Sequence, residues 1–363
     1  MSSERLVSRA LLPLRVTVPG PAVWRWLGAQ TLWVTVAVLL AATVLSFCGR
    51  WAWWPDLLTF WRPHLLVAGA LLGGIGWAGR QRLAAGLALA AALTNLVAIT
   101  TPAGVPQAVA PAEAGGQPLR VVSLNVLADN RRGRSLLEFL RQSDADVIAL
   151  QEVSDHWQRQ LKPLGDLYPY RLPAYGKRPL NETVLLSRYP IADAEVLVPP
   201  KAGFNNAVDG PLRAELEVNG RTVAVYAVHP PTPRSLAQWQ TRNAQLAWVA
   251  AMAEARDGDR PRIMLGDFNT PPWSFLFRDV AATAALRDAG GGLRRPTRQP
   301  MVLPPHLAWL GAPVDHVLVS PDIGVNRFGL GPYVHSDHLP VIADLVLPGT
   351  GTATAEAAPA VSR

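Results

Sequence analysis

Charged residues are absent from three apolar stretches in the first hundred residues, at about 27–48, 64–79 and 83–100. Each stretch is long and apolar enough to favour a helix in a bilayer. The segment between the first two, residues 50–62, is rich in tryptophan, as is typical of a membrane–water interface. Gly69 and Gly73 form a small-xxx-small pair that permits close helix contact. We therefore predict a membrane anchor over residues 1–100 with three transmembrane helices joined by short loops; the alternative is a buried helical hairpin in a soluble domain.

Arginines are distributed unevenly around these stretches. Six lie in the N-terminal tail and in the turn at 80–82, whereas the segment 50–62 has only Arg50 and Arg62. Because positive charge accumulates on the cytoplasmic side of a membrane, we expect a cytoplasmic N-terminus. Three spans then place everything after residue 100 outside the cytoplasm. A cleaved signal peptide would not produce three spans.

From residue 119 the chain alternates between short apolar runs and amphipathic stretches. Strands are expected at 119–126, 147–150, 183–186, 212–218, 222–228, 263–265, 314–319 and 341–346. Helices are expected at 134–142 and 238–256, with a short one after Pro272. Asn219-Gly220 is a strong hairpin signal. This alternation predicts an α/β domain in which residues 287–313 are irregular.

The borders of this domain are marked by changes in composition. Residues 101–118 are rich in Pro, Ala and Gly, which indicates a linker. Residues 349–363 are of low complexity, and we expect a disordered tail. The α/β domain is accordingly predicted to cover residues 119–348.

The net charge of +7 belongs mainly to the predicted anchor. Eight of the 34 basic and three of the 27 acidic residues lie before residue 119, which gives that segment +5 and leaves +2 for the rest. A basic face for nucleic acid is therefore not indicated. Cys48 is the only cysteine, so an intrachain disulfide is impossible, and its context fits a lipoprotein cleavage site poorly.

Polar residues follow or interrupt the predicted strands, where α/β folds tend to build sites. They are Asn125, Glu152, His229, Asp267, Asn269, Asp315, Asp337 and His338. Asp267 and Asn269 stand two apart, so in an extended segment their side chains face the same side. Taken alone, the string Gly266-Asp267-Phe268-Asn269 is more often an ordinary turn.

Six strings in this order closely resemble the endonuclease/exonuclease/phosphatase superfamily of metal-dependent, DNase I-like phosphoesterases. They are Ser123-Leu124-Asn125-Val126, Leu150-Gln151-Glu152-Val153, Val228-His229, Gly266-Asp267-Phe268-Asn269, Val314-Asp315-His316 and Ser336-Asp337-His338-Leu339-Pro340-Val341. The resemblance implies a four-layer α/β sandwich, in which two packed mixed β-sheets are flanked by helices. It does not cover the anchor, which is similar to that of bacterial members. We therefore expect an integral protein of the bacterial inner membrane with a periplasmic catalytic domain.

Phosphate-ester hydrolysis needs neutralised phosphoryl charge and a positioned water, and these residues suit that chemistry. Glu152 is the first candidate ligand for Mg²⁺ or Mn²⁺, which prefer carboxylate oxygens, with Asn125 and Asp337 as further ligands. Asp267 is expected to activate water. Asn125 and Asn269 are expected to hold the phosphate.

The resemblance assigns the remaining three roles. His338 would stabilise the phosphoryl transition state or move a proton, and Asp315 would hold its imidazole in one tautomer. His229 resembles a histidine that supplies an acid for the leaving group in the DNase I-like and sphingomyelinase-like branches.

Other polar side chains and one tryptophan are weaker candidates. His316 and His335 are more readily explained as core or rim histidines, and Trp273 as core packing rather than as a stacking platform. Solvated arginines are the default explanation for four basic residues that could also contact phosphate, namely Arg188, Arg213, Arg294 and Arg295.

We conclude from the sequence that the chain is a divalent-metal-dependent phosphodiesterase at the outer membrane face. The expected substrate is a nucleic acid or a phospholipid headgroup, and the three helices contact the bilayer; no protein partner is indicated. The alternatives are a phosphomonoesterase acting on inositol or lipid phosphates, and a catalytically silent, membrane-anchored binding module.

Overall fold

The computed structural model describes residues 20–104, 116–173, 182–197, 210–291, 294–299 and 305–349. Most of the predicted linker, nearly all of the predicted tail and most of the arginine-bearing N-terminal segment lie outside these residues.

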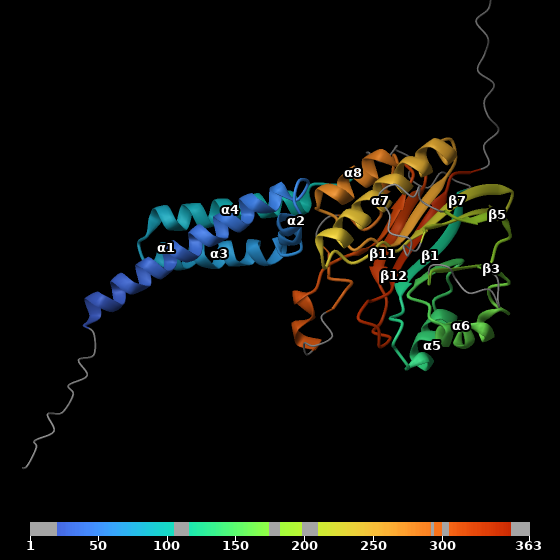
Figure 1. Ribbon diagram of the computed structural model, residues 1–363, viewed down its shortest axis with the longest axis horizontal. Coiled ribbons are helices and arrows are strands. Elements are labelled where there is room, and N and C mark those ends of the chain that lie inside the picture. The colour runs from blue at the N-terminus through green and yellow to red at the C-terminus, as the bar shows by residue number, and fades with distance from the viewer. Residues whose placement is uncertain are drawn as a thin grey trace, which may run out of the picture.

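Three long apolar helices form the N-terminal region and lie side by side (Figure 1). They are α1 (Pro21–Leu45), α3 (Arg62–Ala78) and α4 (Arg82–Thr100). Small residues allow α3 and α4 to approach closely, because a Cβ added at Gly69 would lie 2.7 Å from the carbonyl oxygen of Ala88. The first and last of these helices are each long and apolar enough to cross a bilayer.

Residues 50–62 are not simply a loop, contrary to the sequence expectation. The structure has a short 3₁₀ turn, η1 (Ser46–Cys48), followed by helix α2 (Trp53–Thr59). Pro55 lies in the first turn of α2, where its missing N–H costs no helical hydrogen bond. The axes of α2 and α3 differ by 66°, and together the two helices make a third candidate span that is bent.

Two six-stranded mixed sheets form the remainder of the described chain. In the first, the strands are, in spatial order, β11 (Gly324–Leu330), β12 (Val341–Leu347), β1 (Gln117–Asn125), β2 (Val147–Gln151), β4 (Val184–Ser187) and β3 (Tyr170–Leu172). In the second they are β5 (Ile191–Val196), β6 (Leu212–Val218), β7 (Arg221–Val228), β8 (Arg262–Asp267), β10 (Asp315–Val319) and β9 (Arg287–Asp288). Two pairs are parallel, β1 with β2 and β7 with β8, and the rest are antiparallel.

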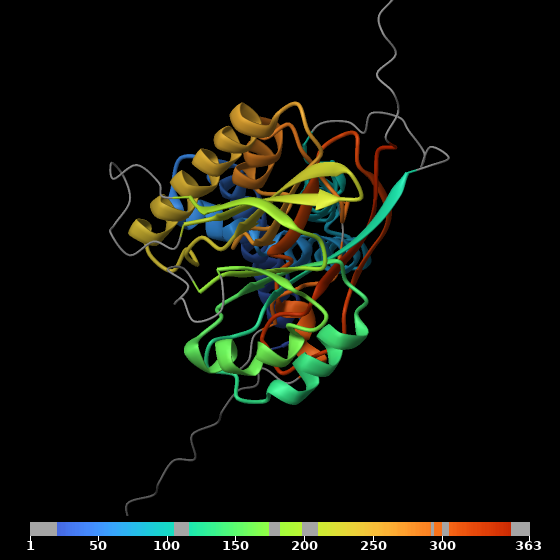
Figure 2. The same ribbon diagram turned by 90° about the vertical axis from the view of Figure 1, so that its right-hand side faces the viewer.

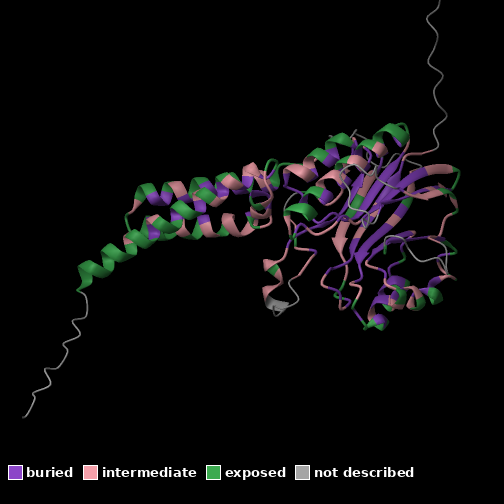
Figure 3. Cartoon of the chain, viewed as in Figure 1, coloured by how far each residue is buried: buried purple, intermediate pink, exposed green. Residues whose placement is uncertain are grey.

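The two sheets pack face to face, with helices on both outer faces (Figures 1 and 2). The shared core consists of side chains on alternate strand positions, for example Val121 on β1 and Leu265 on β8. Helices α5 (Gly133–Gln142) and α6 (Asp155–Gln160) cover the first sheet, and α7 (Leu236–Asp257) and α8 (Phe275–Thr283) cover the second. Short 3₁₀ turns η2 (Lys162–Leu164) and η3 (Pro305–Leu310) complete the elements. The predicted four-layer sandwich is confirmed, and its central strands are largely buried (Figure 3).

Four strands went unrecognised in the sequence, namely β3, β5, β9 and β11. All four lie at the edges of the two sheets. An edge strand is half exposed and needs no continuous apolar run, so its sequence gives a weak signal. The segment 287–313 is likewise not wholly irregular, since it contains β9 and η3.

Helix α2 joins the apolar helices to the sandwich by contacting the loops next to α7 and α8. Indole N–H groups donate in both directions across this contact. Trp53 donates to the carbonyl of Pro233 at 2.9 Å, and Trp273 donates to the carbonyl of Thr59 at 2.7 Å. Arg242 of α7 forms an ion pair with Asp56 of α2 at 2.6 Å, and both side chains are buried.

Candidate active site

The polar residues predicted from the sequence gather at one end of the core between the sheets. Inward-facing positions on three strands are apolar along most of their length and then change to Asn125, Asp267 and Asp315 at this end. Asp267 and Asp315 are direct partners in the β8–β10 ladder. Glu152 and His229 directly follow β2 and β7. The alternation of inward-facing and outward-facing strand positions that builds the core therefore also directs the polar side chains of these strands toward the same end of it.

Unusual backbone conformations shape this end of the sheets. Gly266 has φ +145°, and a Cβ there would lie 2.0 Å from the carbonyl oxygen of Val228, so no other residue fits next to His229 without a shift. Glu152 and Asn269 have φ values of 59° and 50° in the left-handed region, which is uncommon for residues other than glycine. Residues held in sparsely populated backbone conformations cluster at functional sites.

Asn125 lies between two carboxylates. Its Nδ2 donates to Oε1 of Glu152 at 2.8 Å and to Oδ2 of Asp267 at 3.3 Å. Nε2 of His229 is 3.9 Å from the same two carboxylate oxygens. The structure thus brings four predicted side chains together in one cluster, namely Asn125, Glu152, His229 and Asp267.

His338 lies between the carboxylates of Asp315 and Asp267. Its Nδ1 is 2.8 Å from Oδ2 of Asp315, and its Nε2 is 3.7 Å from Oδ2 of Asp267. All three side chains are buried. Asp315 therefore fixes the ring so that Nε2 is directed toward Asp267.

Asn269 fixes the turn after β8 through its backbone N–H, its side-chain amide and its backbone carbonyl. Its N–H donates to Oδ1 of Asp267 at 2.8 Å, and its Nδ2 donates to the carbonyl of Pro230 at 2.9 Å. Its own carbonyl accepts from the guanidinium of Arg242 at 2.9 Å. Since Pro230 engages its amide, the predicted contact of Asn269 with phosphate stays a prediction.

Asp337 is held slightly apart from the cluster. Its carboxylate is 3.6 Å from Nε of Arg298 and is 12% exposed. Its charge still contributes to raising the pKa of the adjacent His338. The role of Asp337 as a metal ligand stays a prediction.

Burial and neighbouring charges set the protonation of the cluster. Burial raises the pKa of the Asp267 carboxyl above its usual value, although the charge of His338 opposes the shift. Burial on its own lowers the pKa of His338, but the charges of Asp315 and Asp267 outweigh it and raise the pKa to about 9. Burial likewise opposes ionisation of Glu152, yet a hydrogen bond from Asn125 and the charge of His229 bring its pKa below the usual value. Asp267 is thus the stronger base and Glu152 the more fully ionised acid.

The donor set at this end of the core fits a hard divalent cation. Asp267, Asp315 and His338 each offer one ligand atom, and these atoms lie within 4.8 Å of one another. Glu152 adds a carboxylate that is 29% exposed. Mg²⁺ and Mn²⁺ prefer such oxygen donors. Asn125 presents its amide nitrogen to the carboxylates, while its Oδ1 accepts from Leu127 N–H at 3.0 Å, so its role as a metal ligand stays a prediction.

The two histidines and the tryptophan that were weaker candidates lie outside the cluster and make packing contacts. His316 is buried on the outer face of the second sheet, with Nε2 2.8 Å from the carbonyl of Thr270. Trp273 is buried against α2. His335, whose φ is 66°, contacts the ring of the exposed Tyr333. These positions agree with the structural interpretations that the sequence favoured.

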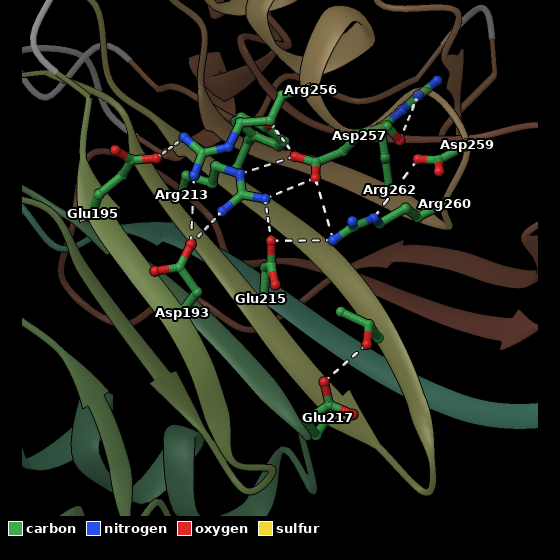
Figure 4. A network of polar contacts seen from close by, with 12 residues as sticks. Asp193, Glu195, Arg213, Glu215, Glu217, Arg256, Asp257, Asp259, Arg260 and Arg262 are labelled. Carbon is green, nitrogen blue, oxygen red and sulfur yellow. Dashed lines mark hydrogen bonds and ion pairs between the residues drawn. The ribbon is translucent and has the colours of Figure 1, made fainter.

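Two of the four arginines are buried rather than solvated, which corrects the default expectation. Arg213 is 1% exposed and pairs with Asp257 at 2.7 Å, within a charged network on the outer face of the second sheet (Figure 4). Arg294 is 7% exposed and pairs with Asp288. Arg188 is partly exposed and pairs with Asp144 at 2.8 Å.

Several supporting groups were missed in the sequence. The N–H of Ala128 donates to Oε2 of Glu152 at 3.1 Å, and Ser336 Oγ donates to the carbonyl of Asn125 at 2.6 Å. Thr297 Oγ1 accepts from the N–H of Asp315 at 3.1 Å. Arg242 links the turn at Asn269 to Asp56 of helix α2. Backbone donors and buried arginines were missed because no local sequence pattern marks them. Ser336 is an exception, since it is part of one of the recognised strings.

A four-layer sandwich with convergent carboxylates, histidines and asparagines at one end of its core defines a phosphoester hydrolase. The model of the Endonuclease/Exonuclease/phosphatase family matches residues 122–338. Because this match spans more than half of the chain, the protein belongs to the endonuclease/exonuclease/phosphatase family. Among curated proteins, none matches the sequence.

Solved structures with this fold include D. rerio TDP2 complexed with single-strand DNA product. It is 18% identical, with 63% of this chain and 99% of that chain covered and a TM-score of 0.52. Sphingomyelinase C from Streptomyces griseocarneus is 18% identical over 63% and 99% of the two chains, with a TM-score of 0.48. An endonuclease/exonuclease/phosphatase from Beutenbergia cavernae is 23% identical over 64% and 72%, with a TM-score of 0.49. The likeness to the first establishes the fold of the sandwich and leaves the substrate open.

Proposed function

We propose that the protein is a divalent-metal-dependent phosphodiesterase anchored in the bacterial inner membrane, with its sandwich on the periplasmic side. The observation that carries the proposal is the cluster of Glu152, Asp267 and His338 around Asn125 at the end of the core. A buried carboxylate, an ionised carboxylate and a histidine held by Asp315 are the groups that hydrolysis of a phosphate ester requires.

Asp267 takes the proton of the attacking water. Its burial raises the pKa of its carboxyl, which makes it a stronger base than an exposed aspartate. The charged imidazole of His338 lies 3.7 Å away and stabilises negative charge on the phosphoryl oxygens. Asp315 keeps that imidazole protonated and in one orientation, and Asn125 and Asn269 hold the phosphate.

Glu152 holds the metal, with Asn125 and Asp337 as further ligands. When bound, Mg²⁺ or Mn²⁺ neutralises phosphoryl charge. What supports a cation at Glu152 is the convergence of its carboxylate with those of Asp267 and Asp315 at one end of the core.

His229 favours a diester over a monoester. Its Nε2 lies 3.9 Å from the carboxylates of both Glu152 and Asp267. A second histidine allows one group to stabilise the phosphoryl oxygens while the other donates a proton to the departing alcohol. That donation matters most when the leaving group is a poorly acidic alkoxide, as in a phospholipid or nucleic acid.

Exposed tryptophans support the membrane placement. Trp24 and Trp26 lie at the start of α1, and Trp77 lies at the end of α3. Trp51 and Trp61 lie at the opposite ends of these helices, next to the sandwich. Two such belts are typical of the two interfaces of a bilayer. Together with the arginine distribution, they favour three spans and a periplasmic sandwich.

The proposal is tested with the full-length protein in detergent micelles and bis(4-nitrophenyl) phosphate as a generic diester. We expect hydrolysis that depends on Mg²⁺ or Mn²⁺ and stops when EDTA is added. Asp267→Asn should lower kcat by about 10²–10⁴-fold because the base is lost while the shape is kept. 4-Nitrophenyl phosphate, a monoester, should be hydrolysed much more slowly.

The matched control is Asp322→Asn, which changes an exposed aspartate of the same domain and should leave kcat unchanged. Full activity of Asp267→Asn would contradict the assigned base. Hydrolysis unaffected by EDTA would contradict the metal. Faster turnover of the monoester would contradict the diesterase assignment.

A further inference from the structure

An apolar groove of about 590 Å³ lies between helix α2 and the sandwich. Leu57, Phe60 and Trp61 line it on the anchor side, and Pro233 and Leu310 line it on the sandwich side. The groove therefore exists only because the anchor and the sandwich are joined. Its volume falls within the range of about 300–1,000 Å³ that is usual for small-molecule sites.

The inner end of the groove adjoins the catalytic cluster. Val314 and Asp337 line this end, and they directly precede Asp315 and His338. Arg298 lines it as well, and its guanidinium is 31% exposed and 3.6 Å from the carboxylate of Asp337. An anionic group at this end would therefore meet a cation next to the catalytic histidine.

The outer end of the groove lies at the level expected for the membrane surface. Trp61 lines the groove and is 49% exposed, and Trp309 of η3 is 56% exposed. The ring of His64 lies between them, at 5.0 Å from Trp61 and 5.4 Å from Trp309. Helix α3 begins at Arg62, so this aromatic group marks the point where the apolar helix leaves the sandwich.

We propose that this groove binds the apolar part of a membrane phospholipid, so that the phosphate of the same lipid reaches the catalytic cluster. This inference rests on the proposed function and specifies its substrate class. One end of the groove lies at the expected membrane surface, and the other is lined by Asp337, which precedes His338, and by Arg298, whose backbone forms a β-bridge with His338. A lipid can thus enter without its acyl chains crossing water, which would carry a large hydrophobic penalty.

The walls favour a lipid over a nucleic acid. A single strand of nucleic acid is usually held by a basic groove that follows its backbone. Here Leu57, Phe60, Pro233 and Leu310 make the walls largely apolar, and only two of the 13 described residues that line them, Arg234 and Arg298, are basic. A polyanion in this groove would also have to lie against the membrane surface.

The reaction needs no reactant besides water. The oxygen of water forms a new bond to phosphorus, and one ester P–O bond breaks. The departing oxygen takes up one proton and leaves as an alcohol. The products are one alcohol and one phosphate monoester.

The test uses the full-length protein reconstituted into vesicles of phosphatidylethanolamine, phosphatidylglycerol and cardiolipin with Mg²⁺ or Mn²⁺. Two activities are measured in the same vesicles, namely hydrolysis of the vesicle phospholipids and hydrolysis of soluble bis(4-nitrophenyl) phosphate. The double variant Leu57→Gln, Phe60→Gln weakens the apolar wall. We expect it to lower lipid hydrolysis by about tenfold or more, seen mainly as a raised KM, with hydrolysis of the soluble diester unchanged.

The control variant is Leu236→Gln, which changes a half-exposed leucine at the start of α7, outside the groove. It should leave both activities unchanged. An equal loss of both activities in the groove variant would overturn the inference, because it would indicate a structural role. Hydrolysis of the soluble diester or of added single-stranded DNA by the wild type, without hydrolysis of any vesicle phospholipid, would also overturn it. Activity on no substrate would instead overturn the proposed function, and this inference with it.

Discussion

At the scale of the residue, the direction of a side chain decides what it contributes. Asp315 and His316 are neighbours in β10, yet Asp315 faces the core between the sheets and reaches His338. His316 faces the opposite way, with its ring 5.2 Å from the ring of Phe268. Strand alternation thus separates a group of the site from a group of the core.

Asp315→Asn tests the role of the first of these residues. Asparagine keeps the volume but removes the charge that holds the imidazole of His338 protonated and oriented. We expect kcat for the soluble diester to fall by about 10²–10⁴-fold, with KM changed much less. Steady-state kinetics of the full-length protein provides the measurement.

A structural explanation for such a loss is checked by thermal unfolding. Asp315→Asn should unfold within a few degrees of the wild type, while Asp315→Glu should recover part of kcat. An unchanged kcat in Asp315→Asn would show that His338 does not depend on this carboxylate.

At the scale of the element, a buried charged network joins strand β6 to the end of helix α7 (Figure 4). Arg213 donates to both carboxylate oxygens of Asp257, at 2.9 and 2.7 Å, and Tyr226 donates to one of them. Burial on its own raises the pKa of Asp257, but the hydrogen bonds from Arg213 and Tyr226 reverse this and lower the pKa. The pair fixes α7 on the sheet, and α7 in turn carries Arg242.

Asp257→Asn should therefore destabilise the sandwich in a pH-dependent way. The variant leaves Arg213 with Glu215 and the more exposed Asp193 as its remaining carboxylate partners, so the loss should be smaller than for an unpaired buried charge, on the order of 2 kcal/mol, which corresponds to a Tm lower by roughly 5 °C at neutral pH. Because the folded pKa of Asp257 is depressed, its contribution is present above the unfolded pKa of about 4 and is lost as pH falls through the folded value. The gap in Tm between wild type and variant should therefore narrow below about pH 4.

The measurement is thermal unfolding in detergent at neutral and acidic pH, followed by tryptophan fluorescence. Glu217→Gln is a suitable control, since its carboxylate accepts from Thr222 at 2.8 Å outside the arginine pair. A constant difference in Tm from pH 7 to pH 3 would refute the assigned pKa shift.

At the scale of the whole molecule, the anchor is part of the architecture around the site. Asp56 of α2 pairs with Arg242, and the same guanidinium donates to the carbonyl of Asn269. The N–H of Asn269 in turn holds Asp267. One buried side chain therefore connects helix α2 to the turn that carries Asp267.

Asp56→Asn should reduce both stability and activity. It leaves Arg242 buried without its counter-charge, which we expect to cost about 3–5 kcal/mol and to lower Tm by roughly 10 °C. The kcat for the soluble diester should fall as well, because Arg242 no longer fixes the turn at Asn269. Thermal unfolding and kinetics of the full-length variant measure the two effects.

A second ion pair at the same contact serves as the control. Arg50 and Asp279 are 2.7 Å apart and about half exposed, so Asp279→Asn should change stability by less than about 1 kcal/mol. The double variant Asp56→Asn, Arg242→Met should recover stability without recovering kcat. Wild-type kcat in Asp56→Asn would show that the anchor does not influence the site.

The sequence predicted the central strands well and the edge strands poorly. The run at 147–150 is apolar because both faces of β2 are buried, whereas 212–218 alternates because β6 turns Leu212, Ala214, Leu216 and Val218 toward the core between the sheets. Edge strands such as β5 and β11 carry charged residues on their exposed face, so no apolar pattern marked them. Likewise, an aspartate and a proline in the segment 50–62 concealed α2, whose burial comes from contact with the sandwich.

What the sequence by itself determined is local: the apolar runs of the anchor, the alternation within central strands, and the polar residues that follow those strands. These properties depend on residues a few positions apart, and they lead to the fold class and the family. The tertiary structure decided which distant groups meet. It buried Arg213 and Arg242 against partners 44 and 186 residues away, placed α2 on the sandwich, and formed the groove from segments that share no local pattern. A buried charge is stable only beside its partner, and the chain acquires that pairing only when it folds.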